Sequence, residues 1–207
     1  MFEDAFIAEI IKLGNDARIA LQLWKEIVSK YQEAGRFYHT LTHVQQIYRD
    51  LVPVKNEISD WPTLIFSIAF HDVIYNPLSK DNEKQSAGYA GIKLSDAHAS
   101  ITQIEKCNKQ ILATITHEFS ADADTNYFTD ADLAILGAAP EAYVSYAADI
   151  RREYSHYPDV AYNEGRKKVI MHFLGMQNIF KTAYFHHHYE SRAKNNLAGE
   201  LGRLGNT

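Results

Sequence analysis

Three features of this 207-residue sequence predict an all-helical fold. Apolar residues recur at three- and four-residue spacing through most of the chain, whereas alternating runs long enough for a strand are hard to find. Glycine and proline are few, at 10 and 5 residues, and several of them stand where a helix can begin or end. A hydrophobic content of 46% and a charged content of 23% are typical of a globular protein rather than a disordered chain.

Signals for helix starts and stops divide the chain into nine expected helices. Pro62 suits a first helical turn, Asn76-Pro77 opposes continuation of the helix before it, and Asp81 can cap the next helix. We expect the longest irregular piece at about Ser120 to Thr129, because it is rich in Asp. The expected helices cover about 2–30, 41–52, 61–74, 81–95, 99–118, 130–138, 141–156, 158–174 and 180–203.

Length and composition predict one all-α, helical-bundle domain over residues 1–207, with a metal-site core at about 30–140 and C-terminal helices at about 141–205. The one cysteine, Cys107, cannot form an internal disulfide, which favours a reducing, cytoplasmic location. Neither a secretion signal nor an apolar run of membrane length is present, so we expect no membrane partner. A net charge of −5 argues against binding to a nucleic-acid polymer. Monomer and homodimer both stay open.

Histidine and carboxylate residues gather in four short stretches of the chain. Neutral imidazole nitrogen and carboxylate oxygen are ligands that a divalent first-row metal accepts, and a mixed set leaves room for a water molecule. The stretches are Tyr38-His39-Thr40-Leu41-Thr42-His43, Phe70-His71-Asp72, Thr116-His117-Glu118 and Thr129-Asp130-Ala131-Asp132-Leu133.

Helical spacing directs several of these groups toward the core. His71 and Asp72 continue the apolar stripe of Leu64 and Ile68, so the pair is expected to point inward. His43 lies one turn before Ile47, and Asp132 lies one turn before Ile135 and Leu136. A buried Asp72 needs compensation, and a divalent cation shared with His71 is one way to provide it. The alternative is that these are hydrogen-bonded core residues, since a His-Asp pair taken alone is weak evidence of a metal site.

The order His43, His71-Asp72, Asp132 resembles the HD superfamily of metal-dependent phosphohydrolases. The fuller pattern is similar to its branch of small predicted HD phosphohydrolases of unknown substrate, and it covers nearly the whole chain. The resemblance rests on Arg36-Phe37-Tyr38-His39, Phe70-His71-Asp72-Val73-Ile74-Tyr75, Asp81-Asn82-Glu83 with Ser86-Ala87, Asp130-Ala131-Asp132-Leu133-Ala134-Ile135-Leu136-Gly137, Ile150-Arg151 with Glu153-Tyr154, Gly165-Arg166, and Ala193 through Leu201.

The resemblance implies a metal site and a proton donor. Its metal ligands would be His43, His71, Asp72 and Asp132. The stretch from Tyr38 to His43 also looks like a motif of cyclic-nucleotide phosphodiesterases whose first His donates a proton and whose second binds metal. That likeness makes His39 a candidate general acid, although Thr40 stands where the motif has Asn, and a structural His39 is the alternative.

The number of metal ions depends on His117. HD enzymes with two metals carry additional His ligands between the His-Asp pair and the last Asp, and here His117 has no clear second partner. We therefore expect one divalent ion, with Mn, Fe, Ni, Co, Zn and Mg all open. His117 is expected to touch that ion, to touch a substrate phosphate, for instance as a catalytic residue, or to face solvent.

Other charged residues are candidates for catalysis and for binding phosphate. Glu83 or Asp81 is placed to orient an attacking water as a general base, with helix capping by Asp81 as the alternative. Guanidinium and ammonium groups match phosphate oxygens, and surface or ion-pairing roles are their alternatives. The candidates for binding the substrate are Arg36, Lys80, Arg151 and Arg166, of which Arg36 and Arg151 lie in the family motifs.

The function expected from these residues and the resemblance is hydrolysis of a phosphate ester in a nucleotide-like or other small phosphorylated metabolite. A first alternative is a metal- or nucleotide-binding regulatory module with a degenerate HD site. A second is an HD oxygenase that uses two irons, against which the missing second set of ligands counts.

Overall fold

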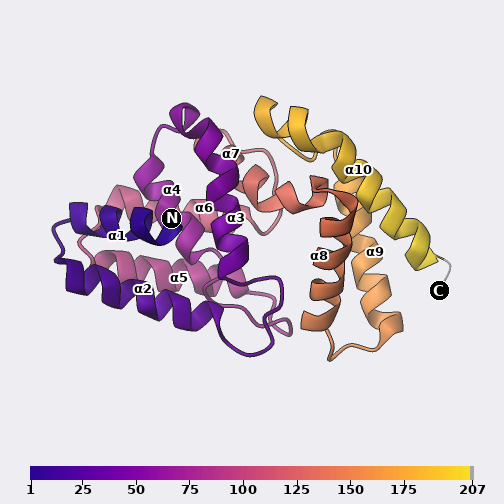
Figure 1. Cartoon of the computed structure of the whole chain (residues 1–207), viewed down its shortest axis with the longest axis horizontal. Helices are drawn as coiled ribbons and strands as arrows, with labels where there is room; N and C mark the ends of the chain where they lie inside the picture. Colours follow the sequence, from indigo (N-terminus) through magenta and orange to yellow (C-terminus); the bar gives the residue numbers. More distant parts are fainter. Residues whose placement is uncertain (206–207) are drawn as a thin grey trace. The chain divides into compact units, whose positions relative to one another are not determined.

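Residues 1–205 are the part of the chain described by the computed structural model, and their regular secondary structure consists of ten α-helices and two 3-10 helices (Figure 1). The predicted all-helical fold class is therefore confirmed, with 73% of the residues helical. The chain divides into two compact units, Met1–Thr129 and Asp130–Thr207. Among the described helices, none combines the length and the apolar character needed to cross a membrane.

The first unit is built around helix α4, which contacts α1, α3, α5 and α6. Apart from Pro62, all residues of α4 are buried, as expected for a helix that is apolar on every side. Asp60 caps the helix by accepting a hydrogen bond from the backbone N–H of Thr63 at 3.1 Å. The helices that begin in this unit are α1 Phe2–Lys12, α2 Ala17–Tyr31, α3 Leu41–Leu51, η1 Val52–Glu57, α4 Trp61–Phe70, α5 Asn82–Asp96, α6 Ile101–Ala113 and α7 Ala123–Leu133.

Aromatic side chains join α1 and α2 to the central helix. The ring centroid of Phe6 lies 5.6 Å from that of Trp24, 6.2 Å from that of Phe66 and 6.0 Å from that of Phe70. All four side chains are at most 5% exposed, and burial of each such side chain stabilises the fold by about 1.5–3 kcal/mol. This core fixes α4, which ends at the residue before His71.

The prediction of one helix over 2–30 was wrong, because the chain breaks between α1 and α2. Gly14 adopts a φ of +96°, a left-handed conformation that favours glycine and that no α-helix continues through. Asp16 then starts α2 by accepting a hydrogen bond from the N–H of Ile19 at 2.8 Å. Two further helices are shorter than expected, since α4 ends at Phe70 and α6 ends at Ala113.

The prediction of an irregular segment at Ser120 to Thr129 was also wrong, because α7 begins at Ala123. The Asp-rich stretch has low intrinsic helix propensity, but tertiary contacts override that preference. Asp124 is 1% exposed and accepts hydrogen bonds from the N–H groups of Ser59 and Asp60 at 2.8 and 2.9 Å. These partners are more than 60 residues away, at separations of 65 and 64, so local sequence does not reveal them.

The second unit packs α10 against α9 and η2. Its interior holds a buried ion pair in which Arg166 donates to Glu200 through Nε at 2.8 Å and through Nη2 at 3.0 Å. The hydroxyl of Tyr143 donates to the same carboxylate. Arg166, a candidate for phosphate binding, therefore has a buried carboxylate as its main partner. The elements of this unit, after the end of α7, are η2 Ala134–Gly137, α8 Pro140–Glu153, α9 Asp159–Gly175 and α10 Ala183–Gly205.

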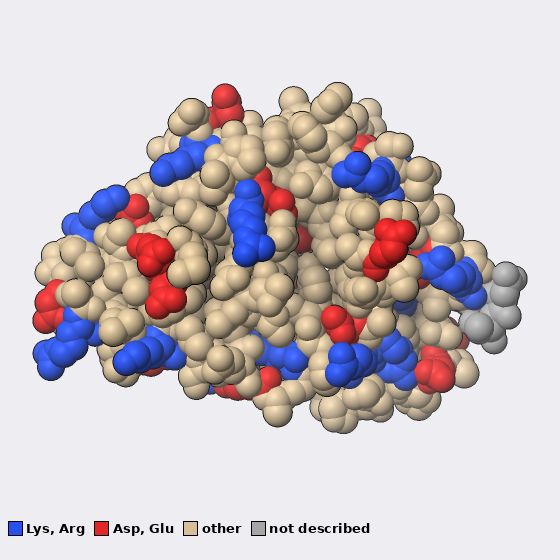
Figure 2. All heavy atoms as spheres, in the orientation of Figure 1, with Lys and Arg blue, Asp and Glu red and all other residues tan. Residues whose placement is uncertain are grey.

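Charged side chains of both signs are mixed over the surface that Figure 2 shows. Lysine and arginine side chains stand beside aspartate and glutamate on this face, and they do not join into a continuous basic area. Such mixing is typical of a solvated surface, in contrast to the basic stripe with which many proteins bind nucleic acid.

Gly137 permits a close backbone approach that the second unit needs. A Cβ atom at this position would lie 2.5 Å from the carbonyl oxygen and 2.6 Å from the Cβ of Tyr189 on α10. We predict that Gly137→Ala lowers the free energy of unfolding by about 1–3 kcal/mol, as overpacking does. Gly165→Ala is the control, because a Cβ there meets nothing within 4 Å and alanine favours the helix. Denaturant titration measures both, and an unchanged Gly137→Ala stability would contradict the close approach.

Candidate metal centre

Three of the predicted ligands meet within the first unit. His43 belongs to the first turn of α3, His71 directly follows α4, and Asp72 comes next in the chain. The Nε2 atoms of His43 and His71 are 3.4 Å apart. Asp72 Oδ2 lies 3.0 Å from His71 Nε2 and 4.0 Å from His43 Nε2. His71 is 1% exposed and His43 is 7% exposed, so the cluster is largely shielded from water.

A backbone contact assigns the tautomer of His71. Its Nδ1 lies 3.0 Å from the carbonyl oxygen of Ile68, which can only accept a hydrogen bond, so Nδ1 carries the hydrogen. In the neutral ring, Nε2 then presents its lone pair to the Oδ2 atom of Asp72, which is also an acceptor. Two acceptors held 3.0 Å apart repel each other unless a cation lies between them. A metal ion between the two atoms, or a proton on His71 or on Asp72, removes this repulsion.

The spacing of the donor atoms fits a metal ion. Two imidazole nitrogens that each lie about 2.1 Å from one ion, at a tetrahedral angle, are about 3.4 Å apart. The Nε2 atoms of His43 and His71 show this separation of 3.4 Å. The hydrogen bond from Nδ1 of His71 to a carbonyl is also the usual way in which a protein orients a ligating imidazole. Together with the carboxylate of Asp72, the pair suits several first-row divalent ions.

Arg36 holds the two segments of the centre together. Its Nη1 donates to the carbonyl oxygen of His39 at 3.1 Å and to that of Asp72 at 2.7 Å, and its Nη2 donates to that of Val73 at 3.0 Å. The guanidinium also lies over the rings of Tyr31 and Tyr75, at 5.1 and 5.4 Å from their centroids. Arg36 is thus a buried link between backbone segments, and its predicted contact with substrate phosphate stays a prediction.

His39 shares the cluster without being as deeply buried as His43. Its ring stacks on Tyr75 with centroids 4.3 Å apart, and its centroid is 6.1 Å from that of His43. Thr40, the residue after His39, caps α3 by accepting a hydrogen bond from the N–H of Thr42 at 3.3 Å. A half-exposed imidazole beside His43 is in a suitable place for a proton donor.

Asp132 lies in the last turn of α7 and is half-buried. The division between the two units falls within this helix, so Asp132 is counted with the second unit. Four residues earlier on α7, in the first unit, the ring of Phe128 packs edge-on against His71, with centroids 5.7 Å apart. Residues four apart share one face of a helix, so Phe128 and Asp132 lie on the same face of α7.

The remaining candidates lie on other segments of the chain. His117 adopts a φ of +53° and donates its N–H to the carbonyl oxygen of Ala113 at 3.0 Å, closing the turn after α6. Glu83 stands half-buried in the first turn of α5, and Lys80 is exposed just before it. Arg151 caps the end of α8 and pairs with Asp159 at 2.7 Å. Their predicted roles stay predictions.

Asp81 precedes α5 without capping it through its side chain. Its carboxylate instead accepts hydrogen bonds from the hydroxyl of Ser79 and from Nε2 of Gln85, the latter at 2.8 Å. These bonds lower the pKa of Asp81, with the Ser79 hydroxyl as the largest cause. The carboxylate is fully exposed, so it has no shielded position from which to act on the cluster.

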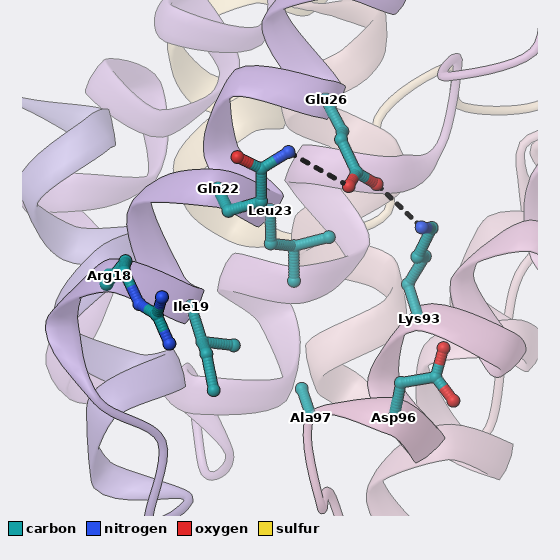
Figure 3. Close-up of a pocket in the computed structure, with 8 residues that line it drawn as sticks. All are labelled: Arg18, Ile19, Gln22, Leu23, Glu26, Lys93, Asp96 and Ala97. Atoms are coloured by element: carbon teal, nitrogen blue, oxygen red, sulfur yellow. Dashed lines mark hydrogen bonds and ion pairs between the residues drawn. The ribbon is translucent and has the colours of Figure 1, made fainter.

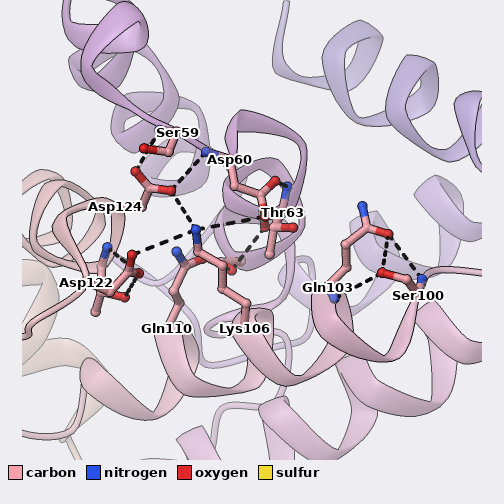
Figure 4. A network of polar contacts seen from close by, with 11 residues as sticks. Ser59, Asp60, Thr63, Ser100, Gln103, Lys106, Gln110, Asp122 and Asp124 are labelled. Atoms are coloured by element: carbon pink, nitrogen blue, oxygen red, sulfur yellow. Dashed lines mark hydrogen bonds and ion pairs between the residues drawn. The ribbon is translucent and has the colours of Figure 1, made fainter.

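A polar network that sequence reasoning missed fixes α4 and α7 relative to each other (Figure 4). The buried carboxylate of Asp124 accepts the N–H groups of Ser59 and Asp60 at the start of α4, and it pairs with Lys106 of α6 at 2.6 Å. Lys106 also lies 3.9 Å from Asp60 and 3.8 Å from Asp122. These contacts hold the first turn of α7 beside the first turn of α4, whereas His71 follows the other end of α4.

A separate surface hollow of about 310 Å³ lies between α2 and α5 (Figure 3). Leu23, Ile19 and Ala97 supply its apolar lining, and the ion pair between Lys93 and Glu26, at 2.6 Å, crosses one side. None of the predicted site residues lines it. The hollow and the candidate metal centre therefore share no residue.

Comparison of the chain with family models, with curated proteins and with solved structures finds no match. The class that fold and site define is accordingly a helical protein with a buried cluster of two imidazoles and a carboxylate. Any closer functional assignment rests on the chemistry of these residues.

The Asp124 network predicts a pH-dependent stability. Burial acts to raise the pKa of Asp124, but the Lys106 ammonium and two backbone N–H donors outweigh it and lower that pKa. A carboxylate with a lowered folded-state pKa stabilises the fold above its unfolded pKa of about 3.9, and this stabilisation is lost as the pH falls through the folded pKa. Asp124→Asn should therefore cost about 1–3 kcal/mol at pH 7 and progressively less below about pH 4.

Urea denaturation of both proteins between pH 2 and pH 7 measures this difference. Asp149→Asn is the matched control, because that carboxylate forms only a short-range contact on α8, with Arg152 at 3.1 Å. A stability difference between wild type and Asp124→Asn that stayed constant over the whole pH range would contradict the network.

Proposed function

We propose that this protein is a metal-dependent phosphohydrolase in which His43, His71, Asp72 and Asp132 hold one divalent ion. The observation that carries the proposal is the convergence of two imidazole nitrogens and a carboxylate oxygen, from His43, His71 and Asp72, at mutual distances of 3.0, 3.4 and 4.0 Å. The tautomer of His71 directs a lone pair into this group. Asp132 joins the proposed ligand set because of the order His43, His71-Asp72, Asp132 in the sequence.

A divalent ion in this position supplies an activated water and withdraws charge from a phosphoryl oxygen. The residues of the chain supply the rest. His39 lies beside the ligand histidines and is half-exposed, so it is placed to give a proton to the oxygen of the leaving group. Burial of His43 and His71 excludes water from one side of the centre and strengthens electrostatic interactions there. The substrate class is a phosphate ester of a nucleotide-like or other small metabolite.

A second function is favoured by the contact of 3.0 Å between His71 Nε2 and Asp72 Oδ2. A proton on Nε2 makes this contact an ion pair and fulfils the need for a cation without a metal. In that case the HD-like site is degenerate and serves a regulatory, nucleotide-binding role. The two functions differ in whether the centre takes up metal and whether phosphate is released.

Removal of a ligand should abolish both metal uptake and turnover. We predict that His71→Gln and Asp72→Ala each weaken Mn²⁺ binding at least about a hundredfold, because loss of a mere orienting partner already costs 10- to 100-fold. Isothermal titration with Mn²⁺ measures the affinity, and phosphate release from a panel of nucleotides and sugar phosphates measures the activity.

His156→Ala and Asp96→Ala are the matched controls for these ligands, since both side chains are exposed and lie outside the cluster. Both control variants should bind Mn²⁺ and release phosphate as the wild type does. If the wild type binds a nucleotide tightly but takes up no metal and releases no phosphate across the panel, the regulatory module is the better account.

The proposed proton transfer from His39 predicts a dependence on the leaving group. His39→Gln keeps the backbone carbonyl that Arg36 uses, so the segment should stay in place. Turnover of alkyl phosphate esters should fall by about 10²- to 10⁴-fold, as expected for loss of a general acid. Turnover of p-nitrophenyl phosphate should fall far less, because p-nitrophenolate leaves without a proton.

Steady-state kinetics on both kinds of ester, at equal Mn²⁺ occupancy, test this prediction. An equal loss for both esters would assign His39 to structure or binding instead of proton transfer. A loss of Mn²⁺ affinity in His39→Gln would show that the residue supports the metal centre.

A further inference from the structure

A gap in the helix packing of the first unit forms the surface hollow of about 310 Å³ that Figure 3 shows. Helix α2 packs on α1, and α5 packs on α4 and α6, whereas the hollow lies between α2 and α5. Its volume is at the lower end of the range of about 300–1,000 Å³ in which proteins bind small molecules. All residues that line the hollow belong to the first unit, so its shape is set within that unit alone.

The floor of the hollow is apolar. Leu23 and Ala97 lie in its middle and are buried on their other sides (Figure 3). Ile19 stands at the margin of the hollow and is 45% exposed. A ligand with an aliphatic part covers this apolar surface and removes it from water, which favours binding.

One side of the hollow carries more negative than positive charge. Nζ of Lys93 lies 2.6 Å from Oε2 of Glu26, and Nε2 of Gln22 donates to the other oxygen of that carboxylate at 3.4 Å. The hydrogen bond to Glu26 raises the pKa of Lys93, and the negative charge of Asp96 acts in the same direction. Two carboxylates thus stand beside one ammonium on this side (Figure 3), which leaves a negative charge in excess.

The other side of the hollow carries the guanidinium of Arg18 (Figure 3). Within residues 1–205, this side chain forms no hydrogen bond and no ion pair. A guanidinium has five N–H donors and matches a carboxylate through two parallel hydrogen bonds. In the same part of the chain, the carboxylate of Asp96 accepts no hydrogen bond. The two sides of the hollow therefore present opposite charges, with an apolar floor between them.

We propose that the hollow binds a small aliphatic zwitterion whose carboxylate pairs with Arg18 and whose ammonium lies against Asp96. The carbon chain of the ligand covers Leu23 and Ala97. A ligand with a single charge matches only one side of the hollow, so an ω-amino carboxylate fits better than an alkyl carboxylate or an alkylamine. The site needs neither a metal ion nor a phosphate ester, and it is therefore independent of the proposed function.

The test is an NMR titration of the full-length, ¹⁵N-labelled protein without metal. The ligands are γ-aminobutyrate, ε-aminocaproate and ω-aminooctanoate, each compared with the carboxylate and the amine of the same chain length. The best of the three should bind at least about threefold more tightly than either singly charged analogue, as expected for one further exposed ion pair. It should also shift the backbone N–H signals of Ile19 and Ala97.

Two results of this titration overturn the proposal. The first is the absence of saturable binding by all three amino carboxylates, or binding that leaves the signals of Ile19 and Ala97 in place. The second is equal affinity for the singly charged carboxylate or amine, because the opposite charge of the hollow then makes no contribution.

Charge-removing variants test the two ends of the ligand separately. Arg18→Gln and Asp96→Asn should each weaken binding of the best amino carboxylate at least about threefold. Both side chains are exposed, so both variants should fold as the wild type does. Arg49→Gln is the matched control, because Arg49 is an exposed arginine of α3 outside the hollow, and its affinity should be unchanged. An unchanged affinity in either hollow variant, or an equal loss in Arg49→Gln, overturns the proposal.

Discussion

The close approach of two imidazole nitrogens and a carboxylate oxygen is the constraint around which the first unit is arranged. His43, His71 and Asp72 bring two imidazole nitrogens and a carboxylate oxygen within 4.0 Å of one another in a place that is largely closed to water. The contact between His71 Nε2 and Asp72 Oδ2 calls for a cation or a proton between the two atoms, because unpaired acceptors in a low-dielectric surrounding are costly. The fold meets this cost by fixing the atoms from several directions, so that one ion or one proton is accommodated in a defined geometry.

The fixing contacts come from backbone and buried charge, and they connect stability to function. The apolar helix α4 sets the position of His71, Arg36 ties the carbonyl of His39 to those of Asp72 and Val73, and the Asp124 network anchors the start of α7. The Arg36 contacts and the Asp124 network each lose most of their stabilisation if one partner is removed, since the other partner is left buried. Residues that touch neither metal nor substrate can therefore determine how well the centre is preorganised.

Periodicity was sufficient to predict the helical class and the inward direction of His43, His71 and Asp72, because those follow from local spacing. It was not sufficient where the structure of a segment depends on contacts with residues far away in the sequence. The Asp-rich stretch before Phe128 forms a helix because Asp124 bonds to the chain near Ser59, and Arg36 meets its acceptors 36 and 37 residues away. The predicted role of Asp132 as a metal ligand and the family resemblance stay predictions.

The most direct test of the account is the location of metal in crystals soaked with Zn²⁺, by anomalous diffraction at the zinc edge. We predict one ordered peak about 2.1 Å from Nε2 of both His43 and His71, with carboxylate oxygens of Asp72 and Asp132 completing the coordination. A peak at the surface histidines alone, with His71 Nε2 bound only to Asp72, would contradict it and would identify the cation of this cluster as a proton.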